Sequence, residues 1–497
     1  MTARLSILLV LVAALLAGCT VGPKYHKPSV SVASAFAELS PATTTNQAPE
    51  AQWWKTFHDP ELDRLVQRAL ESNYNLQIAS TRVRAARLQR NMTAADLFPQ
   101  VDADGGYLRA RGSKNVVLPS GASGGAATGG DPPPVGTSGL NDVLTPFGKG
   151  GLPGKETDLY QAGFDATWEI DVFGGKRRQV QAASAQVREA HEQWHGVKLS
   201  LLAEVARTYL ELRGAQQRLG IGRTNLALQM ETVELTRSLY HSGLGNQADV
   251  TRAAAQAEST AATLPPLEGQ VKNLSHALAL ALGCEPSALS AELSAVQPVP
   301  ATPPEVPVGL PSQLIERRPD IREAEQRIAE ANALVGSAES DLLPKFALVG
   351  SAGLDSTSAQ KLFEWDSRYF LISPTVSWRI FDAGKIFANI RLQRTGKERA
   401  CLQFRLTLLT ALKDVEDALV TYATEQSRRS RLAAASTQYQ RSYTLVRDLY
   451  DHGLATFLDV LDAQRSLLLS QDALAQSDAA VATDLVALYK ALGGGWQ

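Results

Sequence analysis

Five consecutive residues, His191-Glu192-Gln193-Trp194-His195, have the types and the spacing that could bind zinc. In a helix the two histidines lie four residues apart on one face, where both can ligate the same ion. The glutamate between them could then act as the general base of a metallopeptidase. Catalysis of this kind also requires a third protein ligand and an open cleft around the metal.

The residues that follow this motif argue against a zinc metallopeptidase. The motif resembles that of the zincin proteases, but Lys198 and Leu201 stand where the longer metzincin pattern has glycine and histidine. A downstream glutamate such as Glu204 lies on the same straight helix and cannot easily fold back to the metal. We therefore expect a chance match on the face of a coiled coil, with no catalytic residues, no cofactor and no bound metal.

Cys19 is the second residue whose position implies chemistry. Residues 1–18 carry a positive charge at Arg4 and an apolar run that is too short to span a bilayer, which predicts a signal peptide. Small residues before the cysteine resemble the bacterial lipoprotein box, where cleavage leaves Cys19 as a lipid-modified N-terminus; the alternative is a chance cysteine after an ordinary signal peptide. Thr20 is not the aspartate that signals inner-membrane retention, so we expect the outer membrane.

Composition excludes several other kinds of site. Cys284 and Cys401 are far apart and lack metal-like spacing, so we expect two unpaired core thiols. The formal net charge of -2 shows no basic excess, and we expect no nucleic acid partner. The Gly121–Gly130 stretch lacks the Lys-Ser/Thr of a phosphate-binding loop and predicts a flexible loop.

The sequence segments that are predicted to position these residues occur twice in the chain. Trp168-Glu169-Ile170 recurs as Trp378-Arg379-Ile380, and Arg237–Leu244 recurs as Arg447–Leu454, in both cases 210 residues later. A duplication of this length is too long for a short-period solenoid. It predicts a pseudo-symmetric molecule in which each half supplies the same elements.

Each half contains one very long helix. From Lys176 to about Tyr240, and from Lys385 to about Tyr450, there is no proline and helix-forming residues dominate. Roughly 65 residues at 1.5 Å per residue make about 98 Å of helix, a length that predicts a coiled coil. A short break and a second helix follow in each half, so that each half builds a helical hairpin closed by a Gly-Leu turn. The second helices are expected at Ala248–Leu282, interrupted near Pro265-Pro266, and at Phe457–Leu492.

A period-two pattern precedes each long helix. Apolar and polar residues alternate strictly over Tyr160–Val172, and less strictly over Phe370–Ile380, where Pro374 interrupts the apolar face. Weaker partner strands are expected at Val101–Arg109 and Phe346–Leu354. The pattern alone also fits a soluble core, but in a lipoprotein it indicates a transmembrane β-barrel. Four strands cannot close a barrel, whereas three chains supply twelve, so the barrel must be shared.

These features resemble the outer membrane factor family, the TolC-like channels, and within it the lipidated efflux branch (OprM- and NodT-like). The resemblance spans nearly the whole mature chain and rests on these segments: Val21–Tyr25, Trp53–Pro60, the two Leu-Tyr-x-x-Gly-Leu turns, Arg317–Ile321 and Tyr489–Trp496. It implies a mainly α fold with a membrane β-barrel, namely a homotrimer whose twelve-stranded barrel stands on a long α-helical periplasmic tunnel with an equatorial belt.

The same resemblance implies a function. The protein is expected to be a passive exit duct in the outer membrane of a Gram-negative bacterium, anchored in lipid. It would dock a periplasmic adaptor (membrane fusion) protein and an inner-membrane pump of the RND type, and export drugs or other small toxic compounds. Two alternatives stay open, a duct for type I protein secretion and a structural coiled-coil lipoprotein without a pore. Trp168 and Trp378 in the strands disfavour the second, because a soluble rod needs no lipid-facing surface.

On this frame the chain divides into five parts. They are a signal peptide (1–18), a lipid-anchored N-terminal segment (19–60), a first structural repeat (61–285), a Pro-rich equatorial linker (286–311) and a second structural repeat (312–497). The β-hairpins are expected at about 99–173 and 345–382, and the long helical hairpins at about 175–283 and 384–492.

The resemblance also assigns roles to the Gly-Leu turns. Gly243-Leu244 and Gly453-Leu454 resemble the turns that contact the adaptor in this family. Glycine permits a positive φ and a close backbone approach, and an exposed leucine offers an apolar side chain to a partner. The alternative, a glycine that merely ends a helix, does not account for the repeated leucine.

The acids that follow each turn predict a periplasmic gate. Asp459 and Asp462 lie three residues apart, and hence on one helix face. Threefold symmetry would make each a ring of carboxylates, which favours cations. Leu458 and Asp462 match constricting positions of the lipidated efflux channels; tip positions of the wider family are matched by Asp249, Tyr450 and Asp459.

One departure from the family concerns the closed tip. Ala455 stands where some members have an arginine that latches the closed state, so we expect closure to depend on coil packing, Leu458 and the acid rings. A helix-capping role is the alternative for Asp249 and Asp459, because acids in a first helical turn suit the helix dipole.

Overall fold

The computed structural model describes residues 20–38, 44–45, 47, 50–111, 156–303 and 305–496, which fall into two compact units. One unit comprises residues 1–23, 91–180 and 334–391; the other comprises residues 24–90, 181–333 and 392–497. The predicted signal peptide (residues 1–18), the predicted lipidation site Cys19 and the predicted loop at residues 121–130 lie outside the described residues.

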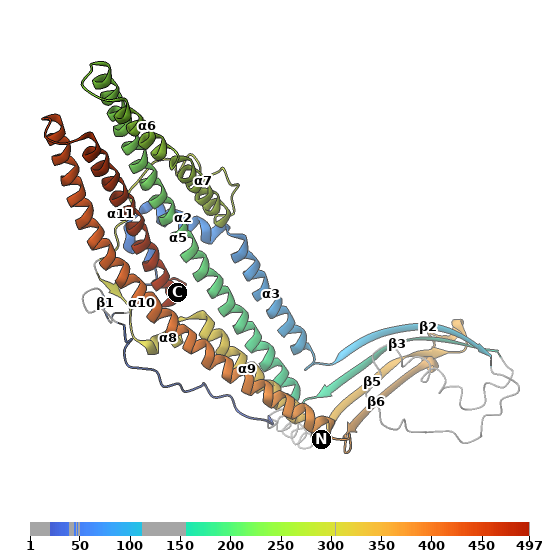
Figure 1. Cartoon of the computed structure of the whole chain (residues 1–497). Helices are drawn as coiled ribbons and strands as arrows, with labels where there is room; N and C mark the ends of the chain where they lie inside the picture. The colour runs from blue at the N-terminus through green and yellow to red at the C-terminus, as the bar shows by residue number, and fades with distance from the viewer. Residues whose placement is uncertain are drawn as a thin grey trace. The chain divides into compact units, whose positions relative to one another are not determined.

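The first unit contains a four-stranded antiparallel sheet in the order β2-β3-β5-β6 (Figure 1). The strands are β2 Gln100–Arg111, β3 Glu156–Ile170, β5 Lys345–Ser356 and β6 Arg368–Ser377. The predicted strand pairs of the two repeats are confirmed, and they join through β3 and β5, where Phe164 pairs with Ala352. The repeats therefore share one sheet whose edges, β2 and β6, pair with no other strand of the described chain.

Two strands end earlier than their alternation predicted. The pattern ran to Val172 and Ile380, but β3 ends at Ile170 and β6 ends at Ser377. The register gives the reason, because β5 begins at Lys345, which pairs with Ser377. Residues beyond that point have no partner strand among those described, and side-chain alternation alone cannot continue a ladder.

The helical hairpins predicted from the sequence are confirmed. Helices α5 Gly175–His241 and α10 Lys385–Asp451 have 67 residues each, and α11 Phe457–Ala491 follows the second. The partner of α5 is split into α6 Gln247–Ala261 and α7 Leu264–Ala281, because Pro265 and Pro266 fit a first helical turn and not a helix interior.

Shorter elements complete the described chain. The remaining helices are α2 Pro60–Ser72, α3 Tyr74–Ala95, α8 Pro311–Arg317 and α9 Pro319–Ser340, with 3₁₀ turns η1 Trp53–Phe57, η3 Ala359–Lys361 and η4 Trp365–Ser367. Strand β1 Thr44–Thr45 pairs in parallel with β4 Val306–Pro307. Within the described residues, no helix combines the length and the apolarity needed to cross a membrane.

The core of the second unit joins the two ends of the chain. Trp53 of η1 is fully buried and stacks on Tyr489 of α11, with ring centroids 5.3 Å apart. The indole N–H of Trp53 donates to the carbonyl of Gly494. Leu202 and Leu210 of α5 belong to the same buried cluster. The Trp53–Pro60 and Tyr489–Trp496 segments, far apart in sequence, thus fold against each other.

Arg318 closes this core beside the C-terminus. Its buried guanidinium lies 2.8 Å from Asp320 and 3.1 Å from Asp414, and it donates to the carbonyl of Ala491 at 3.0 Å. Gly493 has φ +73°, and a Cβ there would lie 2.9 Å from the Arg318 side chain. Only glycine satisfies both the backbone conformation and the close approach. The buried charge is compensated by two carboxylates, as its burial requires.

Two glycines of α5 predict opposite effects on stability. Gly214→Ala would bring a Cβ to 2.6 Å from the Cβ of Ala479 on α11, whereas nothing lies within 4 Å of the Cβ position of Gly220. Gly220→Ala is therefore expected to stabilise the protein by about 1 kcal/mol through helix propensity. Gly214→Ala is expected to destabilise it, since overpacking costs about 1–3 kcal/mol and a Cβ cannot rotate away.

Denaturant unfolding of both variants against the parent protein measures these changes. Gly220→Ala is the matched control, because it makes the same substitution in the same helix, six residues nearer the hairpin tip. Equal stabilisation by both substitutions would contradict the close packing of α5 on α11 at Gly214.

Candidate functional site

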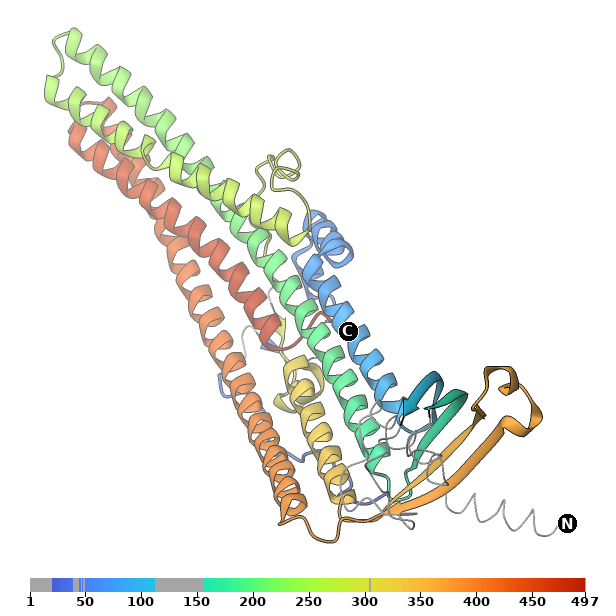
Figure 2. The ribbon, with the colours of Figure 1, turned by 90° about the vertical axis from the view of Figure 1, so that its right-hand side faces the viewer.

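The two Gly-Leu turns of the second unit lie at the same end of their hairpins, as Figure 1 and Figure 2 both show. Val233 of α5, Ala253 and Ala257 of α6 and Phe457 of α11 form one buried cluster near these turns. The first hairpin therefore packs against the second near the tips.

Both turns have the same hydrogen-bonded cap. The N–H of Gly243 donates to the carbonyl of Tyr240 at 3.0 Å, and the N–H of Leu244 donates to that of Leu239 at 2.9 Å. The second turn repeats the pattern at Gly453 and Leu454 with distances of 2.9 and 2.8 Å. Each glycine has φ +73°, which the cap requires.

The leucines of these caps project away from the protein. In this kind of cap the residue after the glycine usually packs back onto its own helix. Leu244 and Leu454 instead remain 79% and 76% exposed. Two large apolar side chains that are held on hydrogen-bonded turns and left mostly exposed provide a surface that a partner protein could cover.

The helix starts after the turns are capped by polar side chains. The side chain of Asn246 accepts from the N–H of Asp249 at 3.0 Å, and Asp249 forms an ion pair with Arg252. In the second hairpin Thr456 and Asp459 form a reciprocal capping box, with the Asp459 carboxylate accepting from the hydroxyl and the N–H of Thr456. These hydrogen bonds lower the pKa of Asp459. Asp459 therefore caps α11, the alternative role that the sequence allowed.

Leu458 and Asp462 occupy the outer face of α11. Phe457, Val460 and Gln464 are buried against the hairpins, whereas Leu458 is 58% exposed and Asp462, four residues on, is exposed beside it. Among the described residues none forms an ion pair with Asp462. The structure thus brings Leu458 and Asp462 together on a face that is open to solvent or to another chain.

Tyr450 has a packing role at the tip. Its ring lies 5.9 Å from that of Phe457, and both contact the cluster shared by the two hairpins. Burial raises the pKa of Tyr450, and the nearby carboxylate of Asp249 raises it further. Tyr450 thus connects α10 with α6 and α11, and it is less exposed than Leu458 or Asp462.

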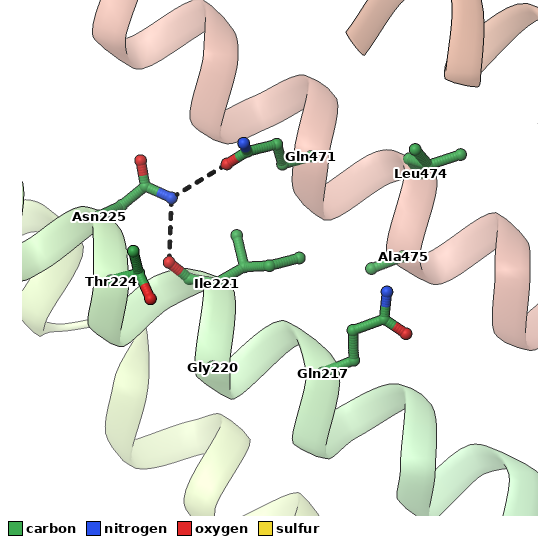
Figure 3. A pocket seen from close by; sticks show the side chains of 8 residues that line it. All are labelled: Gln217, Gly220, Ile221, Thr224, Asn225, Gln471, Leu474 and Ala475. Carbon is green, nitrogen blue, oxygen red and sulfur yellow. Dashed lines mark hydrogen bonds between the residues drawn. The ribbon is translucent and has the colours of Figure 1, made fainter. Parts of the chain in front are cut away.

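An open cavity lined by both amide and apolar side chains lies between α5 and α11 (Figure 3). It has a volume of about 400 Å³, and Asn225 donates across one side of it to Gln471 at 3.2 Å. The buried Oε1 of Gln217, which lines this cavity, finds no hydrogen-bond partner among the described residues. The cavity has room for water molecules that could satisfy it.

The cavity was not predicted from the sequence. The sequence contained one indication of it, because amide side chains such as Asn225 and Gln229 interrupt the apolar stripe of the predicted long helix. This indication was not specific, since amides are also common on solvent-exposed helix faces. Only the packing of α11 against this stretch shows that the amides face inward.

The metallopeptidase motif does come together in the second unit. One nitrogen from each of His191 and His195 and one oxygen of Glu192 lie within 4.8 Å of one another. Glu192 contacts His195 Nδ1 at 3.1 Å and Arg322 at 2.7 Å. Glu192 and His195 are buried, and the His195 ring lies 4.2 Å from that of Trp496. Among the described residues, no histidine, cysteine or acidic side chain from another element belongs to this group of potential ligands.

The comparisons with known proteins agree with the fold. The sequence model of the family described as outer membrane efflux protein matches residues 65–284 and 310–494. The antibiotic efflux pump outer membrane protein ArpC of Pseudomonas putida is 30% identical, over 98% of this chain and 95% of its own length. The outer membrane protein OprJ of Pseudomonas aeruginosa is also 30% identical, over 98% of this chain and 95% of its own.

A solved structure extends the likeness to three dimensions. The outer-membrane channel OprN superposes with a TM-score of 0.83 and 32% identity, covering 96% of this chain and all of that one. The family model covers both repeats, which excludes the metallopeptidase alternative. The chain belongs to the outer membrane efflux protein family and is thus a channel protein of the Gram-negative outer membrane, not an enzyme.

Proposed function

We propose that three copies of this chain assemble into the exit duct of a tripartite efflux system. Their four-stranded sheets would close into one twelve-stranded barrel. The observation that carries this proposal is the sheet itself, whose edge strands β2 and β6 have no partner within the described chain. An unpaired strand edge offers backbone donors and acceptors to a strand of another chain, and three sheets give enough strands for a closed barrel.

The outer surface of the sheet supports a membrane location for this barrel. Phe164, Phe370 and Ile372 are 59%, 83% and 71% exposed, and they lie on strands of both repeats. Large apolar side chains clustered on one sheet are unfavourable when exposed to water. Lipid or a neighbouring chain would cover them. In this proposal residues 286–311 remain a linker at an equatorial belt.

The proposed cargo consists of small toxic organic compounds, antibiotics in particular. The support is the name of ArpC, an antibiotic efflux protein that aligns along nearly the whole chain. The duct itself would be passive, so energy would come from an inner-membrane pump, of the RND type in our proposal. A periplasmic adaptor would join the two by contacting Leu244 and Leu454.

The periplasmic mouth is proposed to close at the first turns of α11. In a trimer Leu458 would form an apolar ring, with acid rings from Asp459 and Asp462 beside it. The exposed face that carries Leu458 and Asp462 supports this assignment. Asp459 contributes charge although it also caps its helix. The small side chain of Ala455 leaves no arginine latch at that position.

Asp462→Ala combined with Leu458→Ala is expected to raise the resting single-channel conductance. The double substitution removes both charge and bulk from the narrow end, and it lowers cation selectivity because a carboxylate ring favours cations. Block by multivalent cations should weaken for the same reason. The measurement is single-channel recording after reconstitution into lipid bilayers.

Asp417→Ala is the matched control for this experiment. Asp417 is an exposed acid on α10 that pairs with Lys413, well removed in sequence from the tip. Its loss should leave conductance and selectivity unchanged. If the double variant also behaves like the parent protein, Leu458 and Asp462 do not line the constriction. A parent protein that forms no conducting channel at all would overturn the proposed function.

Leu244→Asp and Leu454→Asp are each expected to weaken adaptor binding about tenfold or more. Covering a leucine contributes roughly 1.5–3 kcal/mol, and about 1.4 kcal/mol corresponds to a factor of ten. Folding should be unaffected, because both side chains are already exposed. Leu280→Asp is the control, since Leu280 is 76% exposed but lies near the end of α7. The measurement is the affinity of a purified adaptor for each surface-immobilised variant. Unchanged affinity in both tip variants would exclude Leu244 and Leu454 from the interface.

Cys19→Ser is expected to abolish lipidation. A serine lacks the thiol to which the lipid is attached, while the strands would still hold the protein in the membrane. Incorporation of labelled palmitate checks this, with the parent protein as the positive control. Label that persists in the variant would show that Cys19 is not the lipidated residue.

A further inference from the structure

We propose that His191, Glu192 and His195 bind one divalent transition-metal ion in a site that is structural and not catalytic. This inference does not depend on the proposed transport function. It rests on three donor side chains that the folded chain holds together, with supporting contacts from other parts of the second unit.

The backbone of α5 presents the three donors to one side. At about 100° per residue, His195 lies about 40° around the helix from His191, and Glu192 lies about 100° from it. All three therefore point into one sector, and their donor atoms are within 4.8 Å of one another. Donor atoms around a tetrahedral ion are about 3.3 Å apart for bonds of about 2.0 Å. Small side-chain rotations, without backbone movement, would bring the donors to that spacing.

The chemistry of the donors suits an ion such as Zn²⁺ or Cu²⁺. Imidazole nitrogens are the preferred ligands of these ions, and a carboxylate supplies negative charge. Histidine ligates a metal ion through a neutral ring, so binding is expected to weaken as the pH falls.

A second layer of contacts orients the carboxylate. Arg322 of α9 donates to Glu192 Oε1 at 2.7 Å, while Oε2 faces His195 Nδ1 at 3.1 Å. A metal ion could bind Oε2 of Glu192 while Arg322 stays paired with Oε1. Ligating carboxylates are commonly held by a second hydrogen bond in this way, which fixes their orientation and raises affinity. The charge of Arg322 opposes a cation, but its pairing with Glu192 offsets part of that cost.

Enclosure and access are both present at the site. Glu192 and His195 are only 6% and 8% exposed, and Trp496 covers the His195 ring. His191 is exposed and leaves a route from solvent to the donors. A metal site needs such a route as well as its ligands.

The same geometry explains why the site would not hydrolyse peptides. A metallopeptidase uses the glutamate of the H-E-x-x-H motif as its base and takes its third ligand from elsewhere. Here Glu192 would itself be the third ligand, so no base remains. The motif is thus compatible with membership of a channel family.

Metal binding would fasten the C-terminal segment to α5. Trp496 packs on His195, and its indole N–H donates to the carbonyl of Arg317 at 2.7 Å. The carbonyl of Trp496 accepts from the Lys198 ammonium at 3.2 Å. An ion that binds only the folded arrangement stabilises it by mass action. Bound metal is therefore expected to raise the thermal unfolding midpoint of the protein.

The test uses the full-length untagged protein in detergent, stripped with a chelator and titrated with Zn²⁺ by calorimetry. One ion per chain is expected, with Cu²⁺ bound more tightly than Zn²⁺. His191→Ala should lower Zn²⁺ affinity at least tenfold and abolish the rise in the unfolding midpoint. Because His191 is exposed, this variant should fold normally. His276→Ala removes an exposed histidine of α7 and is the matched control, expected to bind as the parent does.

Two further measurements separate metal ligation from packing. Co²⁺ bound at the site should show the visible absorption of a four-coordinate ion, and Glu192→Gln should weaken binding while keeping the fold. No Zn²⁺ binding by the parent protein, or equal binding by His191→Ala and the parent, would overturn the proposal. Export activity that survives in His191→Ala would fit the structural role, whereas a peptidase activity lost in that variant would contradict the non-catalytic assignment.

Discussion

A helix of 67 residues is stable in water only when another helix covers its apolar stripe. Helices α5 and α10 each meet this requirement through the returning arm of the hairpin and through contacts between the two hairpins. The positions of the other elements in the second unit follow from this need for cover. Segments around Trp53 and Arg318 close the part of the bundle where the two chain ends meet, and the turns at the opposite ends of the hairpins remain exposed.

Much of the architecture could be predicted from the sequence, because duplication and periodicity are properties of neighbouring residues. The lengths of α5 and α10, the break at Pro265-Pro266 and the pairing of β2 with β3 all followed from such patterns. The ends of β3 and β6 did not, since a strand ends where its partner ends. That limit is set by Lys345 on another strand, and no local pattern around Ile380 reports it.

The candidate sites show the same division between local and long-range information. The exposed leucines and the capping of α11 by Thr456 and Asp459 lie within a few residues of a recognisable turn. The H-E-x-x-H segment was equally visible, yet its meaning depends on Arg322 and Trp496, which are more than a hundred residues away. The motif shows which potential metal ligands are present. Contacts with distant residues determine whether Glu192 acts as a base, as a metal ligand or as part of an ion pair.

The amides between α5 and α11 also affect how the two hairpins respond to force. An interface of close-packed hydrocarbon resists axial sliding, because each small step separates side chains that were in contact. Asn225 can exchange its hydrogen bond to Gln471 for another polar partner at little cost, and the cavity that both residues line leaves room for the movement. The interface between the hairpins should therefore be compliant at this level and stiff near Arg318, where two carboxylates and a carbonyl hold the guanidinium. A load applied at the tips would be absorbed mainly by the amide layer before it reached the core around Trp53.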